Sequence, residues 1–459
     1  MNRCVWSRGT AALALLAATC ALPVGAQNRG STSLEFAESE RFRELREGKQ
    51  PGGDAEKAKN DEIIRKKARI EVQRMLQAAS AGIGASEGSA VSDIVRNLGE
   101  VIIDPLNPRR TINQNQAEFV VTFGKEMTPE LLKHIGTKEK AGSPEILVRV
   151  NAARMLSILA RSGYDGVADA AVDILKNPDQ IDAVKLYALK ALKHLFAVPN
   201  RERPERSVFS GPDGSDREAK AIVALIDFVA RKPAMTTDTP KNEVDAYRYL
   251  RREAVEALGL VRKPIVRGQG LNAQVIAEPA LWLLRVANAD KNLVPSPSLS
   301  ERVEGLVGYL HLNPDKDENM DYATRYVAAA FRDITTEYIN RKALDKPKAD
   351  DKAPTARFPE ERDYHPWRLT ANRLQIAIRD WRSNWEDNIP AANRPANVQD
   401  MVQAVVIAAD DDILKHIIAG NQTEQIVLDK LRVLIAQQIE KLWLIGEDKN
   451  SVITRPEGQ

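Results

Sequence analysis

The stretch VKLYALKALKHLF, residues 184–196, decides how this chain folds. Val184, Ala188, Leu192 and Leu195 occupy its first, fifth, ninth and twelfth positions. On a helix that turns by about 100° per residue, these positions fall within an arc of about 80°. The stretch therefore predicts a helix with one continuous apolar side, on which the alanine lets a neighbouring helix approach closely.

The same arrangement occurs in VRVNAARMLSILA, which starts at residue 148, and in LRREAVEALGLVR, which starts at residue 250. The second residue of each stretch is basic, the fifth is alanine and the ninth is leucine. The first two starts are 36 residues apart and the next two are 66 apart, close to two such steps. The shared residues are Val148, Arg149, Ala152 and Leu156; Val184, Lys185, Ala188 and Leu192; and Leu250, Arg251, Ala254 and Leu258.

Weaker copies start at Arg217 and Ala323, and other helical segments lie between the copies. A helix, turn, helix unit that recurs every thirty-odd residues is typical of a solenoid. The alternative is an ordinary helical bundle, because four matching positions arise by chance in helices rich in Ala and Leu.

At these residues the chain resembles the HEAT-repeat family of α-solenoids, whose second helix reads V-R-x-x-A-x-x-A-L. The resemblance covers roughly residues 128–335. It implies an all-α fold, a right-handed superhelical α-solenoid of stacked antiparallel helix pairs, and an interaction scaffold rather than a catalyst. It also implies a ladder in which the basic second residue meets acidic residues of neighbouring turns. The candidate acidic partners are Glu145, Asp182 and Asp245, which lie at different distances from their helix starts.

The first 26 residues have the three parts of a secretory signal. Arg3 and Arg8 flank the start, and the apolar stretch TAALALLAATCALPVGA ends in small residues, with Val24 and Ala26 before the cleavage point. This stretch is shorter than the roughly 20 residues of a membrane span. We expect cleavage after Ala26 and export to the periplasm or the medium.

An alternative is a lipoprotein anchored through Cys20, although Thr19 stands where such signals prefer Gly, Ala or Ser. Both cysteines precede Ala26, so the exported chain would hold no disulfide and no cysteine metal ligand. Cleavage also removes two of the 66 basic residues, which leaves as many basic as acidic residues. This balance gives no argument for binding nucleic acid or an anionic membrane. No later apolar run is long enough to span a membrane.

Composition shifts divide the rest of the chain, and aromatic residues make up only 5% of it. Segments rich in Pro, Gly and charge mark the boundaries. The expected parts are a signal (1–26), a flexible charged segment (27–60), an N-terminal helical region (61–127), the HEAT-like repeats (128–344), an exposed insertion (345–365), a C-terminal helical region (366–445) and a disordered tail (446–459).

Two short motifs resemble catalytic or metal sites. GASEG, residues 84–88, matches the nucleophile pattern G-x-S-x-G around Ser86, but a charged helix precedes it where that chemistry needs a strand. DKDENMD, residues 315–321, alternates acidic residues like a calcium loop, but Met320 and Tyr326 stand where glycine and glutamate are required. We expect an interhelical loop and a solvated turn at these places.

Five histidines occur, none paired at metal-ligand spacing. His194 lies at the edge of the apolar side of its helix, where a boundary residue is expected. No Gly-rich phosphate-binding motif follows the signal. We therefore expect no catalytic residue, no cofactor and no metal.

The stretch WRLTANRLQIAIRDWRSNW, residues 367–385, combines tryptophans with arginines, residue types that are enriched at binding interfaces. Trp381 and Trp385 are four residues apart and share a helix face. They either pack beneath the end of the stack or belong to an interaction surface. The candidate surface residues are Trp367, Arg379, Trp381, Arg382 and Trp385.

These observations favour an exported, non-enzymatic helical-repeat scaffold that binds a protein or peptide partner in the periplasm or cell envelope. Stacked helix pairs form a long surface for binding without any catalytic residue. The alternative is an envelope hydrolase that uses Ser86 or a pair of carboxylates. A purely architectural protein without a discrete partner is a third interpretation.

Overall fold

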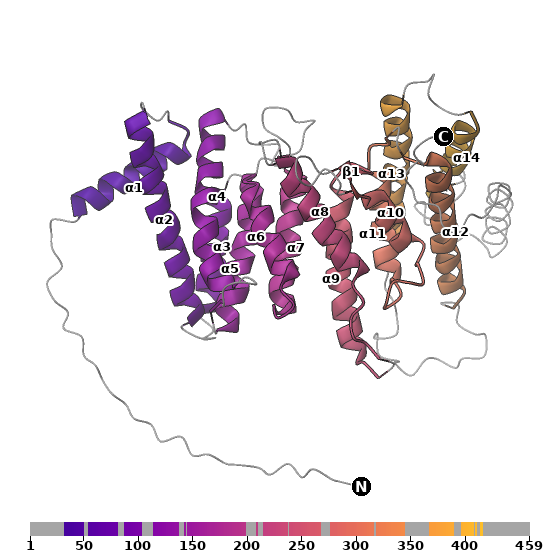
Figure 1. Cartoon of the computed structure of the whole chain (residues 1–459), viewed down its shortest axis with the longest axis horizontal. Coiled ribbons are helices and arrows are strands. Elements are labelled where there is room, and N and C mark those ends of the chain that lie inside the picture. The colour runs from indigo at the N-terminus through magenta and orange to yellow at the C-terminus, as the bar shows by residue number, and fades with distance from the viewer. Residues whose placement is uncertain are drawn as a thin grey trace, which may run out of the picture.

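In the computed structural model, helices stand side by side in a row that runs from α1 to α12 and α14 (Figure 1). The signal, Ser86, the insertion and the tail lie outside the residues that the structure describes. The described residues are 32–49, 54–80, 87–102, 113–136, 142–143, 145–198, 208–209, 214–236, 238–267, 276–315, 318–344, 367–389, 396–407, 409–410 and 414–415.

The described part of the chain is helical apart from turns and one two-residue strand pair, so the predicted all-α class is confirmed. The strands β1 (Val266–Arg267) and β2 (Ile276–Ala277) pair antiparallel. The helices are α1 (Thr32–Arg46), α2 (Asp54–Ser80), α3 (Glu87–Val101), α4 (Gln114–Ile135), α5 (Ile146–Leu159), η1 (Ala160–Ser162), α6 (Gly166–Lys176), α7 (Asp182–Ala197), α8 (Gly214–Ala230), α9 (Lys241–Gly259), α10 (Pro279–Ala287), α11 (Leu299–Leu310), α12 (Met320–Leu344), α13 (Trp367–Asn388) and α14 (Ala396–Ile407).

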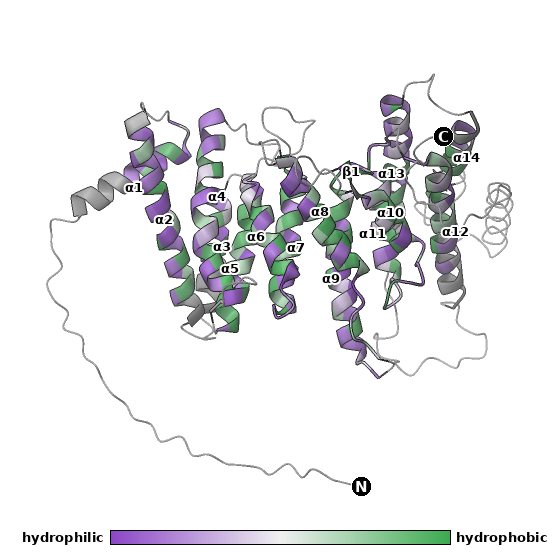
Figure 2. Ribbon diagram, in the orientation of Figure 1, coloured by the Kyte–Doolittle hydropathy of each residue, from purple (hydrophilic) through white to green (hydrophobic). Residues whose placement is uncertain are grey.

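The helices form two layers. Even-numbered helices from α2 to α14 contact one another in chain order, and so do odd-numbered helices from α3 to α13. Contacts between the layers join α4 to α5, α6 to α7, α8 to α9 and α10 to α11. Each helix carries hydrophobic and hydrophilic residues together (Figure 2), and no described helix is long and apolar enough to cross a membrane.

The three matching stretches form α5, α7 and α9, which are consecutive helices of the odd layer. Their nine shared apolar residues are all buried, and none is more than 5% exposed. The apolar side read from the sequence is thus the side that faces neighbouring helices. Burying it removes apolar surface from water, which is the main stabilising contribution to such a stack.

The predicted spacing of thirty-odd residues between copies holds from α5 to α7 but is wrong from α7 to α9. Between α7 and α9 the described residues contain one helix, α8, so the 66-residue interval is not two repeats. The weak copy at Arg217 lies in α8 and that at Ala323 in α12, both in the even layer. Packing requires the faces of neighbouring helices to match. A longer loop between two helices, by contrast, raises the entropic cost of closing that loop only slowly. The spacing of helices can therefore vary while the stack continues.

Two predicted boundaries fall inside helices. The boundary between residues 60 and 61 lies in α2, and that between residues 127 and 128 lies in α4. The segment predicted to be flexible includes α1, whose Phe42 is buried with its ring 5.4 Å from the ring of Phe119. This apolar contact orders a segment that its charged composition alone suggested would be flexible.

Helices α9 and α11 approach closely at two glycines. A Cβ atom added to Gly259 would lie 2.6 Å from Cα of Gly308, closer than real Cβ contacts. Only glycine fits here without a movement of one helix.

We expect Gly259→Ala to lower the free energy of unfolding by about 1–3 kcal/mol, because the added carbon overpacks the contact with α11. The matched control is Gly99→Ala in α3, where an added Cβ has no described atom within 4 Å. That change should raise stability by about 0.5–1 kcal/mol through helix propensity. Urea unfolding of both variants tests the prediction, and similar effects at the two sites would contradict the close approach.

Candidate functional site

The basic second residues of the matching stretches lie where one odd helix meets the next. Arg149 of α5 donates a hydrogen bond from Nη2 to Oε1 of Gln180, just before α7. The amide nitrogen of Gln180 donates in turn to the carbonyl oxygens of Ile135 and Gly136, each at 3.1 Å. The side chain of Gln180 therefore links the end of α4 and Arg149 of α5 to the start of α7.

The corresponding residue of α9 is fully buried. Arg251 is 0% exposed and donates from Nε to Oε1 of Glu301 in α11 at 2.6 Å. Oε2 of Glu301 also accepts hydrogen bonds from the backbone nitrogen and the hydroxyl of Ser298, at 2.6 and 2.8 Å. One carboxylate thus caps α11 and holds α9.

The predicted acidic partners of this ladder need correction. Glu301, not Asp245, pairs with Arg251, and Asp245 instead lies 3.7 Å from Arg248. Lys185 donates to the carbonyl oxygen of Pro178 at 3.4 Å, and burial lowers its pKa. The Ser-x-x-Glu pattern at 298–301 is a helix-start signal that could have identified Glu301.

Other ion pairs join neighbouring helices of the same layer. Most involve partly exposed side chains, so each stabilises by roughly 0–1 kcal/mol and chiefly sets the register of the two helices. The pairs are Arg65–Glu126 (2.5 Å) and Arg69–Glu130 (3.0 Å) from α2 to α4, Arg217–Asp165 (3.0 Å) and Arg217–Asp169 (2.8 Å) from α8 to the start of α6, Lys193–Glu253 (3.5 Å) from α7 to α9, and Arg373–Glu304 (2.6 Å) from α13 to α11.

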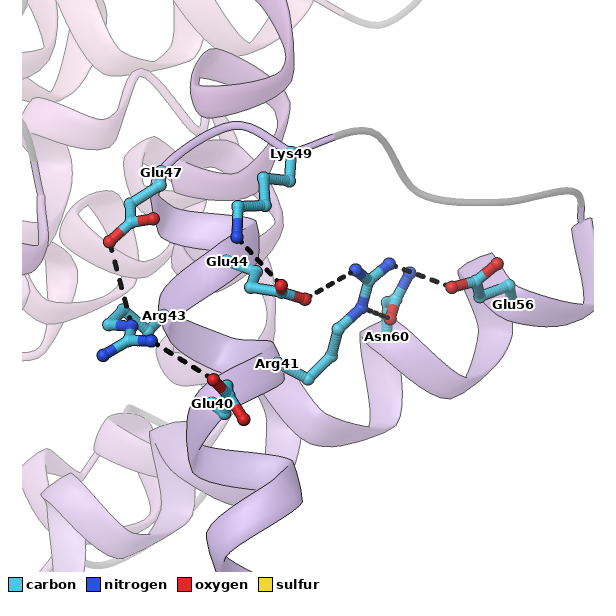
Figure 3. Close-up of polar contacts among 8 residues, drawn as sticks. All are labelled: Glu40, Arg41, Arg43, Glu44, Glu47, Lys49, Glu56 and Asn60. Carbon is cyan, nitrogen blue, oxygen red and sulfur yellow. Dashed lines mark hydrogen bonds and ion pairs between the residues drawn. The ribbon is translucent and has the colours of Figure 1, made fainter.

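A similar cluster fixes α1 at the N-terminal end of the row (Figure 3). The guanidinium of Arg41 donates to Glu44 in α1 and to Glu56 and Asn60 in α2, at 3.0–3.1 Å. Lys49 donates to the other oxygen of Glu44 at 2.9 Å. Together with Phe42, these contacts hold α1 across the first helices.

Of the two interpretations of the tryptophan stretch, packing against neighbouring helices holds for Trp381 and Trp385, which therefore do not belong to an exposed interaction surface. Trp381 and Trp385 are 1% and 2% exposed, so they belong to the core between α13 and its neighbours. Trp367 is partly buried. The other two members, Arg379 and Arg382, are exposed and pair with Asp410 at 2.6 Å and Glu386 at 3.0 Å. Trp381 and Trp385 are buried because α13 packs on α11.

Trp381 packs beside a buried polar pair. Its ring centroid lies 6.4 Å from that of Tyr309, whose hydroxyl donates a hydrogen bond to Oε1 of Glu318 at 2.9 Å. Burial raises the pKa of Glu318 to about 7 and raises that of Tyr309 well above its usual value. This carboxyl therefore holds its proton up to near-neutral pH.

Among the residues that the structure describes, the other three buried glutamates each lie against a cation. Glu301 pairs with Arg251, while Glu218 lies 2.6 Å from Lys263 and Glu253 lies 3.5 Å from Lys193. These contacts neutralise the carboxylates. Across the described residues, no three His, Cys, Asp or Glu side chains come together as metal ligands would. The hydrolase hypothesis gains no support from the carboxylates, and Ser86 lies outside the described residues.

His194 connects α7 to α5 and to η1. Its Nδ1 lies 2.6 Å from the carbonyl oxygen of Ser157, and its Nε2 lies 3.2 Å from Nη2 of Arg161. A carbonyl only accepts and a guanidinium only donates, so the neutral ring carries its proton on Nδ1. Burial is the main cause that lowers the His194 pKa from 6.5.

We expect nuclear magnetic resonance of the labelled protein to show His194 as the Nδ1–H tautomer with a pKa below 6.5. The unfolded chain then protonates His194 more readily than the folded chain does. The contribution of His194 to the free energy of unfolding is therefore fully present above pH 6.5, and it is lost as the pH falls from 6.5 through the lowered pKa. The matched control is His194→Gln, which should remove that part of the pH dependence. A dominant Nε2–H tautomer would contradict the geometry.

On four helices, an exposed or half-buried aromatic residue is followed three positions later by a lysine or an arginine. The geometry places each cation over the ring, where the π electrons attract it. The sequence reading missed this pattern, although the i, i+3 spacing was visible. The pairs, with cation-to-ring distances, are Tyr187–Lys190 (5.8 Å, α7), Tyr249–Arg252 (5.1 Å, α9), Trp282–Arg285 (4.9 Å, α10) and Tyr322–Arg325 (5.7 Å, α12).

The four pairs fall on two pairs of contacting helices, α7 with α9 in the odd layer and α10 with α12 in the even layer. We call the group on α7 and α9 the odd-layer patch. Tyr249 is its most accessible aromatic side chain, at 39% exposure. No protein-family model matches the sequence, and no curated protein matches it either.

Proposed function

We propose that this protein is an exported helical-repeat scaffold that binds a protein or peptide partner in the periplasm or cell envelope, without catalysis of its own. The observation that carries the proposal is the uninterrupted order of contacts within the two helix layers. Such an arrangement makes each helix pair contact mainly its neighbours, which is how repeat proteins build long binding surfaces.

The finer architecture we propose is a right-handed, HEAT-like α-solenoid. The buried apolar sides of α5, α7 and α9 support it, as do the ladder contacts of Arg149 and Arg251. The varied spacing of the helices is compatible with a solenoid, because only the faces between helices must match.

The proposed location follows from the signal pattern that ends at Ala26. Mass spectrometry of the protein recovered from the producing cells tests it. A chain that starts at Gln27 supports export with cleavage, whereas a lipid attached at Cys20 supports the anchored alternative. An intact N-terminus on protein that stays in the cytoplasm would overturn the proposal.

The odd-layer patch is the surface we propose for partner binding, because Tyr and Arg frequently dominate binding energy at interfaces. Crosslinked affinity capture from the native envelope fraction tests it. We expect one reproducible partner with the native protein and its loss with Tyr249→Ser/Arg252→Ser. The matched control is Asn242→Ser/Glu243→Ser, two exposed positions at the start of the same helix, which should retain the partner.

Recovery of the same proteins with an unrelated tagged exported protein would overturn the scaffold function. If the Tyr249→Ser/Arg252→Ser variant still captures the partner, the partner binds outside the odd-layer patch.

A further inference from the structure

Three cations lie on the side of the odd layer that faces away from the even layer. They are Arg154 on α5, Lys190 on α7 and Arg252 on α9, three helices that are consecutive neighbours in that layer (Figure 1). Each cation stands two positions from the buried alanine that its matching stretch shares with the other two. On a helix that turns by about 100° per residue, it therefore points about 160° away from that alanine. We call these three residues the cation row.

The contacts between α5 and α7 place the first two cations at about the same level. Nδ1 of His194 lies 2.6 Å from the carbonyl oxygen of Ser157. Lys190 precedes His194 by four residues, and Arg154 precedes Ser157 by three. Contacts near both ends of α5 and α7 show that these helices run in parallel. The two cations therefore lie side by side, one turn before this contact.

The contacts between α7 and α9 place the third cation at the same level. Lys193 lies against Glu253 at 3.5 Å and also pairs with Glu256. Residue 193 is thus level with the stretch between these two glutamates, and Lys190, three residues earlier, is level with Arg252. Glu256 also lies 3.5 Å from Arg252, so the positive charge of the row is greatest on α5 and α7.

The cations on α5 and α7 are not neutralised by carboxylates. Across the residues that the structure describes, Arg154 has no ion pair, and Lys190 lies only over the ring of Tyr187, at 5.8 Å. Helix α5 holds no acidic residue, and α7 holds only Asp182, at its first position. Interfaces pair opposite charges, so this surface calls for carboxylates on its partner.

Apolar and aromatic side chains lie beside the cation row, about one turn nearer the helix starts. Val150, Leu186 and Tyr187 are half-buried against the core, and Tyr249 is 39% exposed. A cation already lies over each of these two tyrosine rings. Single-stranded bases bind by stacking on open aromatic faces. The surface therefore favours a protein partner that carries apolar residues next to its acidic ones.

The spacing of the cation row favours a helix as the part of the partner that binds. Packed neighbouring helices have axes about 8–10 Å apart, which sets the distance from one cation to the next. Residues seven apart on a helix share a face and lie about 10.5 Å apart along its axis. In an extended strand, side chains on one face repeat every 6.6 Å or so. A helix that lies across α5, α7 and α9 thus presents one carboxylate to each cation.

We infer that the cation row binds an acidic amphipathic helix of a partner protein, with carboxylates seven residues apart and apolar residues beside them. The inference rests on the proposed scaffold function. It names the partner chemistry of the odd-layer patch and extends that surface to Arg154 on α5.

Fluorescence anisotropy with labelled synthetic peptides tests the partner chemistry. The acidic peptide has three copies of the heptad EAAQLAA, which places its glutamates and leucines on one face. The composition control has three copies of AAEQLAA, with the glutamates on the opposite face, and the charge control has three copies of KAAQLAA. We expect the acidic peptide to bind about fivefold or more tightly than either control. Equal affinities, or no saturable binding of the acidic peptide, would overturn the inference.

The row variant is Arg154→Gln/Lys190→Gln, which should weaken binding of the acidic peptide by about fivefold or more. The matched control is Lys176→Gln/Lys220→Gln, the same loss of charge at exposed positions of α6 and α8 in the even layer, which should change binding less than about twofold. Circular dichroism checks the folding of both variants. Equal losses in the two variants would assign the effect to net charge and overturn the inference.

Reversed charges give a gain of binding that loss of folding cannot produce. The variant Arg154→Glu/Lys190→Glu should prefer the KAAQLAA peptide to the EAAQLAA peptide. An unchanged preference for the acidic peptide would place its binding outside the row. If the native protein instead binds anionic lipid vesicles or oligothymidine, loses that binding in the row variant and does not bind the acidic peptide, the row belongs to a membrane or nucleic-acid surface and the inference fails.

Two outcomes separate this inference from the scaffold function. If the native protein captures an envelope partner and the acidic peptide does not bind, the assigned chemistry fails while the scaffold function stands. If the acidic peptide binds as expected and no envelope partner is captured, the cation row stands as a site for acidic helices and the envelope scaffold function fails.

Discussion

Replacing Arg251 by methionine is expected to lower the free energy of unfolding by about 3–5 kcal/mol, which is the usual cost of leaving one member of a buried ion pair alone. Glu301 is 1% exposed and lies 2.6 Å from Arg251 Nε. Without the guanidinium, its carboxylate would keep only the bonds from Ser298. Urea unfolding followed by circular dichroism measures the change.

The neighbouring residue supplies a matched control. Arg252 is 32% exposed and pairs with Glu256 at 3.5 Å, so Arg252→Met should cost less than about 1 kcal/mol. The double variant Arg251→Met/Glu301→Gln should recover most of the loss, since the amide oxygen still caps α11 without a buried charge. A cost below about 1 kcal/mol for Arg251→Met would show that the pair does not hold α9 to α11.

The second large expected effect is the pH dependence at Glu318. Its pKa is raised from 4.5 to about 7, mainly by burial. Between these values the folded chain holds a proton that the unfolded chain releases, so stability falls as the pH rises through this window. The cost reaches about 3 kcal/mol above pH 7, since one pKa unit corresponds to about 1.4 kcal/mol.

Glu318→Gln should remove this loss, because its side chain stays neutral at every pH. We expect the stability difference between the variant and the native protein to move by about 2.5 kcal/mol in favour of the variant from pH 5 to pH 8. The control, exposed Glu243→Gln, should show no such change. Parallel pH curves for Glu318→Gln and the native protein would contradict a buried, protonated Glu318.

The helix faces were readable from the sequence, because the apolar period is a local property. The buried residues of α5, α7 and α9 were named from spacing alone, and they are buried. The location of the signal and the proposed export also rest on local sequence.

The partners of the polar residues were not readable in this way. Arg149 bonds a residue 31 positions away and Arg251 one 50 positions away. Loop lengths between helices vary, so no fixed offset points to Gln180 or Glu301. The acidic residues expected near each helix start therefore did not include Glu301, and Asp245 lies beside Arg248 instead of Arg251.

For Trp381 and Trp385, spacing showed a shared face but not what covers it. Only the position of α13 against α11 places Trp381 beside Tyr309, with ring centroids 6.4 Å apart. Tyr309 in turn donates to the buried carboxyl of Glu318, which comes from the segment before α12.

The sequence by itself determined that the chain is helical and which side of each repeated helix is buried, because these depend on residues within a few turns. Tertiary structure decided the order of the two layers, the ladder partners and the burial of the tryptophans. Each of these depends on distances between side chains far apart in the chain, which the packing of whole helices sets.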